Sequence, residues 1–193
     1  MRYLWLVILG VLLAEGAGYW WHRYASHMGL FRFVYRDLLR RRHFDHHIHR
    51  YPVKRLNSKQ YLESCEVSFQ VLAAIMIVIG AALVLSGVVT VSKVLVVLGS
   101  GAAYGVLVLG PFHSLYHVKD LWLERFGWFR WLRDFHQIHH LINANYTIFL
   151  PIFDILGRSY VSPRHLSGLK PVNQFPGFDA SRSSTCGESL FKG

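Results

Sequence analysis

Ten of the twelve histidines of this chain fall into four spaced clusters, and each cluster begins at or just beyond the end of an apolar stretch. Imidazole is a common ligand for iron, zinc, copper and nickel. Four clusters in one short chain, two of them with the same H-x-x-H-H pattern, predict one polynuclear metal centre at a membrane face. The clustered residues are His22 and His27; His43, His46 and His47; His113 and His117; and His136, His139 and His140.

The spacing within the clusters suits helices that carry metal ligands. Each residue of an α-helix advances about 100°, so residues three or four apart lie on one face. Three of the clusters have this spacing and can present two or three ring nitrogens to a common point. His22 and His27 are five apart, about 140° around an ideal helix. This pair is therefore the weakest candidate among the clusters for binding one metal ion. We expect its members to bind two different metals or to flank a helix end.

The number of imidazoles indicates the kind of metal. A structural zinc site needs about four ligands, whereas two metals with about five nitrogens each would use all ten histidines. Nitrogen-rich sites with an open position suit redox-active iron. Beside a lipid-facing cavity, two iron ions would use O2 to oxidise an apolar substrate. Zinc competes well for imidazole and would also be expected in purified samples.

Several other polar side chains lie near the clusters. His49 is a candidate additional ligand, and six residues are candidates to orient a ligating imidazole or a metal-bound water. Each of the six has a structural alternative: a helix-packing hydrogen bond for the glutamate, ion pairs with arginines for the aspartates and turn caps for the asparagines. The six are Glu15, Asp45, Asp120, Asp134, Asn143 and Asn145.

Three apolar stretches are close to the ~20 residues that cross a hydrocarbon core. Hydrophobic residues make up 52% of the 193 residues, above ordinary soluble usage. The stretches are Tyr3–Trp21, Val67–Ser86 and Val94–Phe112, and the short segment Ser86–Lys93 makes the last two a helical hairpin. We predict an all-α integral membrane protein with three, or as many as four, transmembrane helices and a histidine-rich helical cap. Leu121–Leu132 is expected to form a helix along the membrane surface.

The charge of +10 indicates the orientation. The segment His22–Glu66 is rich in arginine and lysine, whereas the loop between the second and third spans holds only Lys93. The positive-inside rule explains this bias better than nucleic-acid binding does and places His22–Glu66 in the cytoplasm. The hairpin returns the chain to the same side, so all four clusters are expected at the cytoplasmic face of a bacterial inner membrane or the endoplasmic reticulum. Residues 1–158 form the membrane domain, and residues 159–193 form a cytosolic tail.

The order of the clusters, with a hairpin between the second and third, resembles the fatty acid hydroxylase superfamily of membrane di-metal oxygenases. That group includes sterol desaturases, sphingolipid fatty-acyl hydroxylases and bacterial carotenoid ring hydroxylases. The resemblance covers about Glu15–Arg158. It is carried by RRHFDHHIHRYP (Arg41–Pro52) and by FHQIHHLINANYTIFLPIFDILGR (Phe135–Arg158), which ends in an element with Phe153, Asp154 and Gly157.

The resemblance implies that the ten clustered histidines are iron ligands. It also implies that the chain catalyses O2-dependent hydroxylation or desaturation of a lipid. A fatty-acyl or sphingoid chain ranks first as substrate, a carotenoid ring second and a sterol third, and hydroxylation is favoured over desaturation. Electrons would come from a separate ferredoxin or haem protein. Two features depart from the family: many members have four spans, and the pattern H-x-x-H-H-x-H leaves open which of His46, His47 and His49 bind metal.

Two interpretations belong to other classes of protein. A metal transporter would place its ligands near the bilayer midplane on broken helices, whereas these histidines lie past the ends of the spans. A catalytically inactive scaffold would keep a structural zinc pair, and its lack of lipid oxidation would distinguish it.

Overall fold

The computed structural model describes residues 3–28, 43, 46, 47, 51, 56 and 67–171, with the backbone alone for 67–72. These residues form helices of α, π and 3-10 type, and none of them is in a β-strand. The mostly helical class predicted from the sequence is confirmed for this part of the chain.

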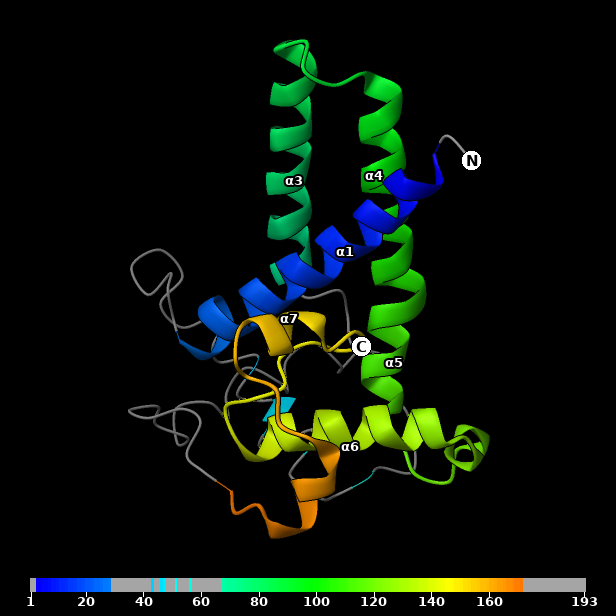
Figure 1. The fold of residues 1–193 in the computed structure, drawn as a ribbon, viewed down its shortest axis with the longest axis vertical. Coiled ribbons are helices and arrows are strands. Elements are labelled where there is room, and N and C mark those ends of the chain that lie inside the picture. The colour runs from blue at the N-terminus through cyan, green and yellow to red at the C-terminus, as the bar shows by residue number, and fades with distance from the viewer. Residues whose placement is uncertain are drawn as a thin grey trace, which may run out of the picture.

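A helical hairpin forms one end of the molecule (Figure 1). Helix α3 (Val67–Leu85) and helix α4 (Val91–Tyr104) stand side by side and are joined by a short turn. Gly87 in this turn has φ of +74°, a left-handed conformation that glycine adopts without steric cost. The chain continues from α4 through the π-helix η3 (Gly105–Leu109) into α5 (Gly110–Leu115), so the third predicted span is one long helix.

Helix α1 (Leu4–Trp20) crosses α4 obliquely (Figure 1). The crossing is close because small residues meet there: Gly101 lies against the Gly10 carbonyl, and a Cβ on Gly10 would overlap Ser100. Small residues allow such close approach of backbones between membrane helices. Below the crossing, the Tyr104 hydroxyl donates to the buried carboxylate of Glu15 over 2.6 Å, a second link between the two helices.

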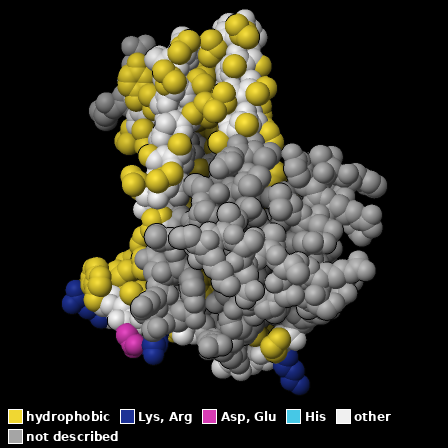
Figure 2. Space-filling model, turned by 180° about the vertical axis from the view of Figure 1, so that it is seen from behind, with side chains coloured by type: hydrophobic (Ala, Val, Ile, Leu, Met, Phe, Trp, Pro, Cys, Tyr) yellow, Lys and Arg dark blue, Asp and Glu magenta, His cyan; other side chains and the backbone are white. Residues whose placement is uncertain are grey.

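Two described helices are long and apolar enough to cross a membrane, Leu4–His27 and Val91–Leu115. The second predicted span corresponds to α3, whose part Ala73–Leu85 is a shorter apolar helix, so a third span stays a prediction. On the face shown in Figure 2, hydrophobic side chains cover the hairpin, and the charged side chains of described residues lie at the opposite end. Such large exposed apolar surface indicates contact with lipid.

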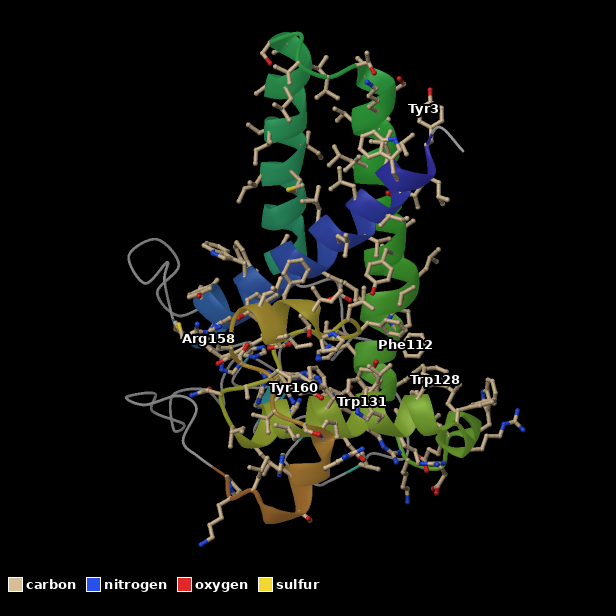
Figure 3. All side chains as sticks on the ribbon, in the orientation of Figure 1. Tyr3, Phe112, Trp128, Trp131, Arg158 and Tyr160 are labelled. Atoms are coloured by element: carbon tan, nitrogen blue, oxygen red, sulfur yellow. The ribbon has the colours of Figure 1, made fainter. Side chains whose placement is uncertain are left out.

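The end opposite the hairpin turn is built around helix α6 (Gly127–Leu141), which lies across the end of α5 (Figure 1). A short 3-10 helix, η4 (Trp122–Arg125), precedes it, and Phe126 between them is extended. The predicted helix Leu121–Leu132 is therefore wrong in its bounds, because the chain breaks at Phe126 and α6 continues through the last histidine cluster. Phe112 and Trp128 lie together where α5 approaches α6, with ring centroids 5.9 Å apart (Figure 3).

The chain after α6 folds back over the histidine-bearing helices. It contains the short helix α7 (Ile152–Leu156) and the 3-10 helix η5 (Pro163–Gly168). The Asn145 side chain bonds both backbone groups of Val161, and Ser159 bonds Asp154. These hydrogen bonds hold residues 159–161, the first of the predicted tail, against the chain that follows α6.

Candidate metal centre

The described histidines of all four clusters converge below the helical hairpin. Nine of them form two groups in which the ligand atoms all lie within 4.8 Å of one another. The first group is His22, His27, His43, His47 and His139; the second group is His46, His113, His117 and His136. The predicted convergence of imidazoles from distant segments is thus present, as two sets of side chains that could each hold a metal ion.

His140 lies between the two groups. Its Nε2 is 3.1 Å from His136 Nε2 in the second group, and its ring stacks on His47 of the first group with centroids 4.1 Å apart. Adjacent rings of the two groups are close elsewhere too, with His46 and His47 centroids 5.5 Å apart. All ten predicted ligands therefore lie in one continuous cluster with two centres.

The two H-x-x-H-H patterns divide between these centres in opposite ways. His43 and His47, four residues apart, belong to the first group, and His46 belongs to the second. In α6 the reverse holds: His139 belongs to the first group and His136 to the second, with His140 3.1 Å from His136. Adjacent residues on a helix differ by about 100° in direction, so a histidine doublet faces two centres and not one.

The pair His22 and His27 belongs to one group, although its spacing fits an α-helix poorly. Residues Trp21–His27 form a π-helix, η1, and the Met28 amide donates to the carbonyl of Arg23, five residues earlier. The wider turn brings residues five apart to one side, and the two rings are 5.3 Å apart. The expectation of two different metals is corrected by this local widening, which is frequent at functional sites. The other expectation, a helix end, agrees with the structure, because the helix Leu4–His27 ends at this pair.

The donor atoms fit metal ions better than they fit hydrogen bonds with one another. In the first group, His43 Nε2 is 3.1 Å from His22 Nε2 and 2.8 Å from His27 Nε2. Two nitrogens bound to one ion at about 2.1 Å and about a right angle apart would be separated by about 3 Å. A single proton on His43 Nε2 cannot serve both neighbours, whereas a shared cation can.

Backbone carbonyls fix two imidazoles of the first group. His22 Nδ1 is 2.6 Å from the Tyr146 carbonyl, and His139 Nδ1 is 3.0 Å from the Ala144 carbonyl. A carbonyl oxygen only accepts, so each Nδ1 carries the proton and each Nε2 keeps its lone pair for a metal. The loop after α6 therefore orients these ligands, as outer partners of metal-binding histidines do.

Aromatic rings cover the second group. Tyr51 stacks on His117, with centroids 3.9 Å apart and planes inclined by 17°. Tyr116 lies 5.5 Å from His136 and belongs to a buried cluster with Phe129. These rings restrict the imidazoles by packing.

Burial keeps the imidazoles neutral. The pKa values of six histidines outside the membrane-spanning helices lie well below the usual value because burial disfavours the charged form, and neighbouring imidazoles lower them further. A neutral imidazole binds metal without first losing a proton. The six are His43, His47, His117, His136, His139 and His140.

Glu15, a predicted partner of His22, has a packing role in this structure. Its Oε1 accepts hydrogen bonds from the Tyr104 hydroxyl and from the Leu150 amide over 3.1 Å. The carboxylate thus joins α1 to α4 and to the loop before α7, in agreement with the helix-packing alternative.

The other candidate orienting residues that the structure describes form no hydrogen bond with a described histidine. Asp120 has φ of 60°, is 85% exposed and pairs with Lys119, so its predicted role behind the third cluster is corrected. Asp134 is partly buried beside arginines, and its pKa is raised mainly by burial. Asn143 is exposed. Asn145 is buried and donates to the Phe135 carbonyl over 3.1 Å, which clamps the loop to α6.

Two predicted residues, Asp45 and His49, lie outside the described residues. The choice among His46, His47 and His49 therefore stays open for His49, whereas His46 and His47 both lie in the cluster, one in each group.

Sequence reasoning assigned no role to the groups that orient the first set of ligands. Backbone carbonyls have no signature in the sequence. Asp154 is fully buried and accepts hydrogen bonds from the Tyr146 and Thr147 amides, both over 2.8 Å. In the sequence, Asp154 is marked only by its place in the element with Phe153 and Gly157, which belongs to the family resemblance.

Comparison with known proteins identifies the family. Residues 7–159 match the family model described as fatty acid hydroxylase. No curated protein and no solved structure matches the chain. The matched region contains all ten clustered histidines, the helix Val91–Leu115 and, from residue 7 onward, the helix Leu4–His27. The chain therefore belongs to the fatty acid hydroxylase family, whose members are oxidoreductases.

Proposed function

We propose that this chain is a membrane-embedded di-iron oxidoreductase that uses O2 to hydroxylate a membrane lipid, with a fatty-acyl or sphingoid chain as substrate. The observation that supports it most is the convergence of imidazoles from four segments into two adjoining groups at the ends of membrane-length helices. The family match over residues 7–159 supports the class of reaction.

Each histidine group would hold one iron ion, with His140 completing the second set. Bound iron would supply the activation of O2 and the one-electron chemistry that oxidation of an unactivated C–H bond requires. The protein holds the ligands in place and excludes water, since the imidazoles outside the spans are buried and ringed by Tyr51, Tyr116 and Tyr146.

The position of the site suits a substrate that resides in the bilayer. His22 and His27 end one apolar helix, and His113 lies in the last turns of the other. On the face shown in Figure 2, exposed apolar side chains cover the hairpin. A lipid chain could therefore reach the histidines from the side. A transporter would need ligands near the middle of the bilayer, so this depth favours an enzyme.

Two further parts of the proposal follow from sequence. The two cysteines, Cys65 and Cys186, cannot ligate an iron–sulfur cluster, so a separate ferredoxin or haem protein would donate electrons. The positive charge between His22 and Glu66 supports a cytoplasmic position for the site.

The test is lipid analysis of a lipid-producing host that expresses the full chain. We expect one lipid class to gain an oxygen atom in the wild type and in the exposed-histidine variant His165→Ala, but not in His139→Ala. Growth under isotopically heavy O2 should place the label in that lipid. Loss of two hydrogens without oxygen gain would indicate a desaturase, and unchanged lipids with metal still bound would indicate an inactive scaffold.

A further inference from the structure

Asp154 is a buried acceptor with four donors and a defined place behind the first histidine group. Oδ1 accepts from the Tyr146 amide and the Ser159 hydroxyl, each over 2.8 Å. Oδ2 accepts from the Thr147 amide over 2.8 Å and from the Thr147 hydroxyl. The side chain is fully buried, so these bonds hold it in one orientation.

One peptide group lies between Asp154 and His22. The Tyr146 carbonyl and the Thr147 amide belong to the same planar peptide unit. Its N–H donates to Asp154 Oδ2, and its C=O accepts from His22 Nδ1 over 2.6 Å. Because hydrogen bonds in series polarise one another, the carboxylate makes this carbonyl a stronger acceptor.

A second peptide unit, two units earlier in the chain, holds His139 in a similar way. The Ala144 carbonyl accepts from His139 Nδ1 over 3.0 Å, and the Asn145 amide of the same unit donates to the Ser159 carbonyl over 2.9 Å. Ser159 in turn donates its hydroxyl to Asp154. The Ser159 carbonyl and hydroxyl are separate groups, so the direct hydrogen-bonded series from Asp154 leads to His22, and Ser159 only places the His139 partner beside Asp154.

A cation lies at the far end of the network. The Arg23 guanidinium donates to the Tyr19 hydroxyl and, over 2.7 Å, to the Gly157 carbonyl. The Tyr19 hydroxyl is 3.1 Å from Ser159 Oγ, which bonds Asp154. The carboxylate is therefore linked through two hydroxyls to a positive charge on the π-helix that carries His22.

We propose that Asp154, the Tyr146–Thr147 peptide group and His22 form a hydrogen-bonded relay, and that Asp154 is a positioning residue for metal binding by the first histidine group. The inference rests on the proposed function only in that a metal ion is bound there. The relay fixes the proton of His22 on Nδ1 and increases electron donation from Nε2, as a carboxylate in direct contact does in other metal sites.

The test measures metal binding by the purified full chain loaded with zinc and then exposed to a competing chelator. Asp154→Asn removes the negative charge whichever way the amide turns. We expect it to lower the affinity of one of the two sites ten- to hundredfold, the usual effect of losing such a partner, with the other site unchanged. A circular dichroism spectrum equal to that of the wild type shows that the variant is folded.

A control variant separates the relay from a merely structural role. Thr147→Val removes one hydroxyl donor from Asp154 and leaves both amide bonds and the Ser159 bond intact. The relay predicts that this variant keeps two metals at wild-type affinity, because the relay uses only the backbone amide of Thr147. Equal losses in Thr147→Val and Asp154→Asn, or no loss in Asp154→Asn, would overturn the proposal.

A second measurement avoids Asp154 variants in case they do not fold. In zinc-loaded wild type with isotopically labelled histidine, nuclear magnetic resonance reports which nitrogen of each ring carries the proton. We expect His22, assigned by the signal lost in His22→Gln, to carry a strongly hydrogen-bonded proton on Nδ1. A proton on its Nε2 would refute the relay.

These outcomes are independent of lipid chemistry. A wild type that binds two metals but oxidises no lipid would refute the proposed function and leave the relay intact. An active wild type whose Asp154→Asn variant binds both metals normally would refute the relay alone. A wild type that binds no metal would overturn both.

Discussion

The two histidine groups differ in what lies behind the imidazoles. In the first group, carbonyls of Ala144 and Tyr146 accept the Nδ1 protons of His139 and His22. In the second group the Nδ1 atom of His136, and beside it that of His140, are buried without a hydrogen-bond partner among the described residues. Hydrogen bonding thus orients His22 and His139, whereas ring packing restricts His117 and His136.

The difference matters because the two kinds of support fix different properties. A carbonyl partner fixes the tautomer, the ring direction and the electron density at the other nitrogen. An aromatic neighbour such as Tyr51 on His117 fixes the ring plane but leaves the tautomer free. Two metals with the same type of ligand are therefore expected to differ in affinity.

Ligand removal should produce the largest effect and show whether the groups bind metal separately. His139→Ala takes a ligand from the first group and His136→Ala takes one from the second. Each variant is expected to fall from about two bound metals to about one and to lose lipid oxidation, because both ions act together. Elemental analysis of purified protein measures this, with His165→Ala as the matched control.

Full loss of both metals in either variant would show a single cooperative site. Retention of both would show that the removed imidazole is not a ligand.

Removal of a covering ring should affect one group only. Tyr51→Leu takes away the ring stacked on His117 and is expected to weaken the second site by about tenfold. Tyr146→Leu removes a ring 5.5 Å from His139 but keeps the backbone carbonyl that holds His22, so the first site should stay near wild-type affinity. Chelator competition measures both. A weaker first site in Tyr146→Leu, together with an unchanged second site in Tyr51→Leu, would contradict the assignment of hydrogen bonding to the first group and ring packing to the second.

The crossing of α1 and α4 sets the distance between the groups, because α1 leads to His22 and α4 leads to His113. Gly10→Ala would place a methyl group against Ser100 and the Val97 carbonyl. We expect a loss of about 1–3 kcal/mol in the free energy of unfolding, as overpacking usually causes. The matched control is Gly18→Ala on the same helix, where an added Cβ meets nothing within 4 Å.

Denaturant unfolding in detergent micelles measures the two glycine variants side by side. Equal stability of both would show that the helices are not in contact at Gly10.

The sequence was sufficient to predict the participating histidines and the helical hairpin. Histidine spacing and apolar length are local properties, and a metal centre needs its ligands in one place wherever they lie in the chain. For this reason imidazoles as distant as His43 and His139 could be assigned to one centre.

The distribution of ligands between two centres could not be predicted, because it depends on helix geometry. The π-helical turn at Trp21–His27 shifts the hydrogen bonds by one residue, and tertiary packing decides this. The sequence predicts orienting partners among side chains, because side chains are visible in a sequence and backbone carbonyls are not. These candidates are Glu15, Asp45, Asp120, Asp134, Asn143 and Asn145. The observed partners are carbonyls of a loop whose path depends on Asp154 and Asn145.

Lowering the pH should show the smallest difference between the two groups, or none, in their contribution to the free energy of unfolding. Burial lowers the pKa of His43, His47 and His139 in the first group and of His117, His136 and His140 beside the second. In the metal-free protein, the unfolded chain binds protons below about pH 6.5 and the folded chain does not, so the free energy of unfolding falls as pH falls. His139→Gln and His136→Gln each remove one such group and should flatten the slope equally, by at most about 1.4 kcal/mol per pH unit.

Unfolding in micelles between about pH 8 and about pH 5 measures this slope. The control variant His165→Gln, which changes an exposed ring, should leave the slope unchanged. A larger flattening of this slope in one variant than in the other would show that the imidazole removed there is more strongly desolvated in the folded protein. The two groups would then differ in burial as well as in the hydrogen bonds and ring contacts that orient their imidazoles.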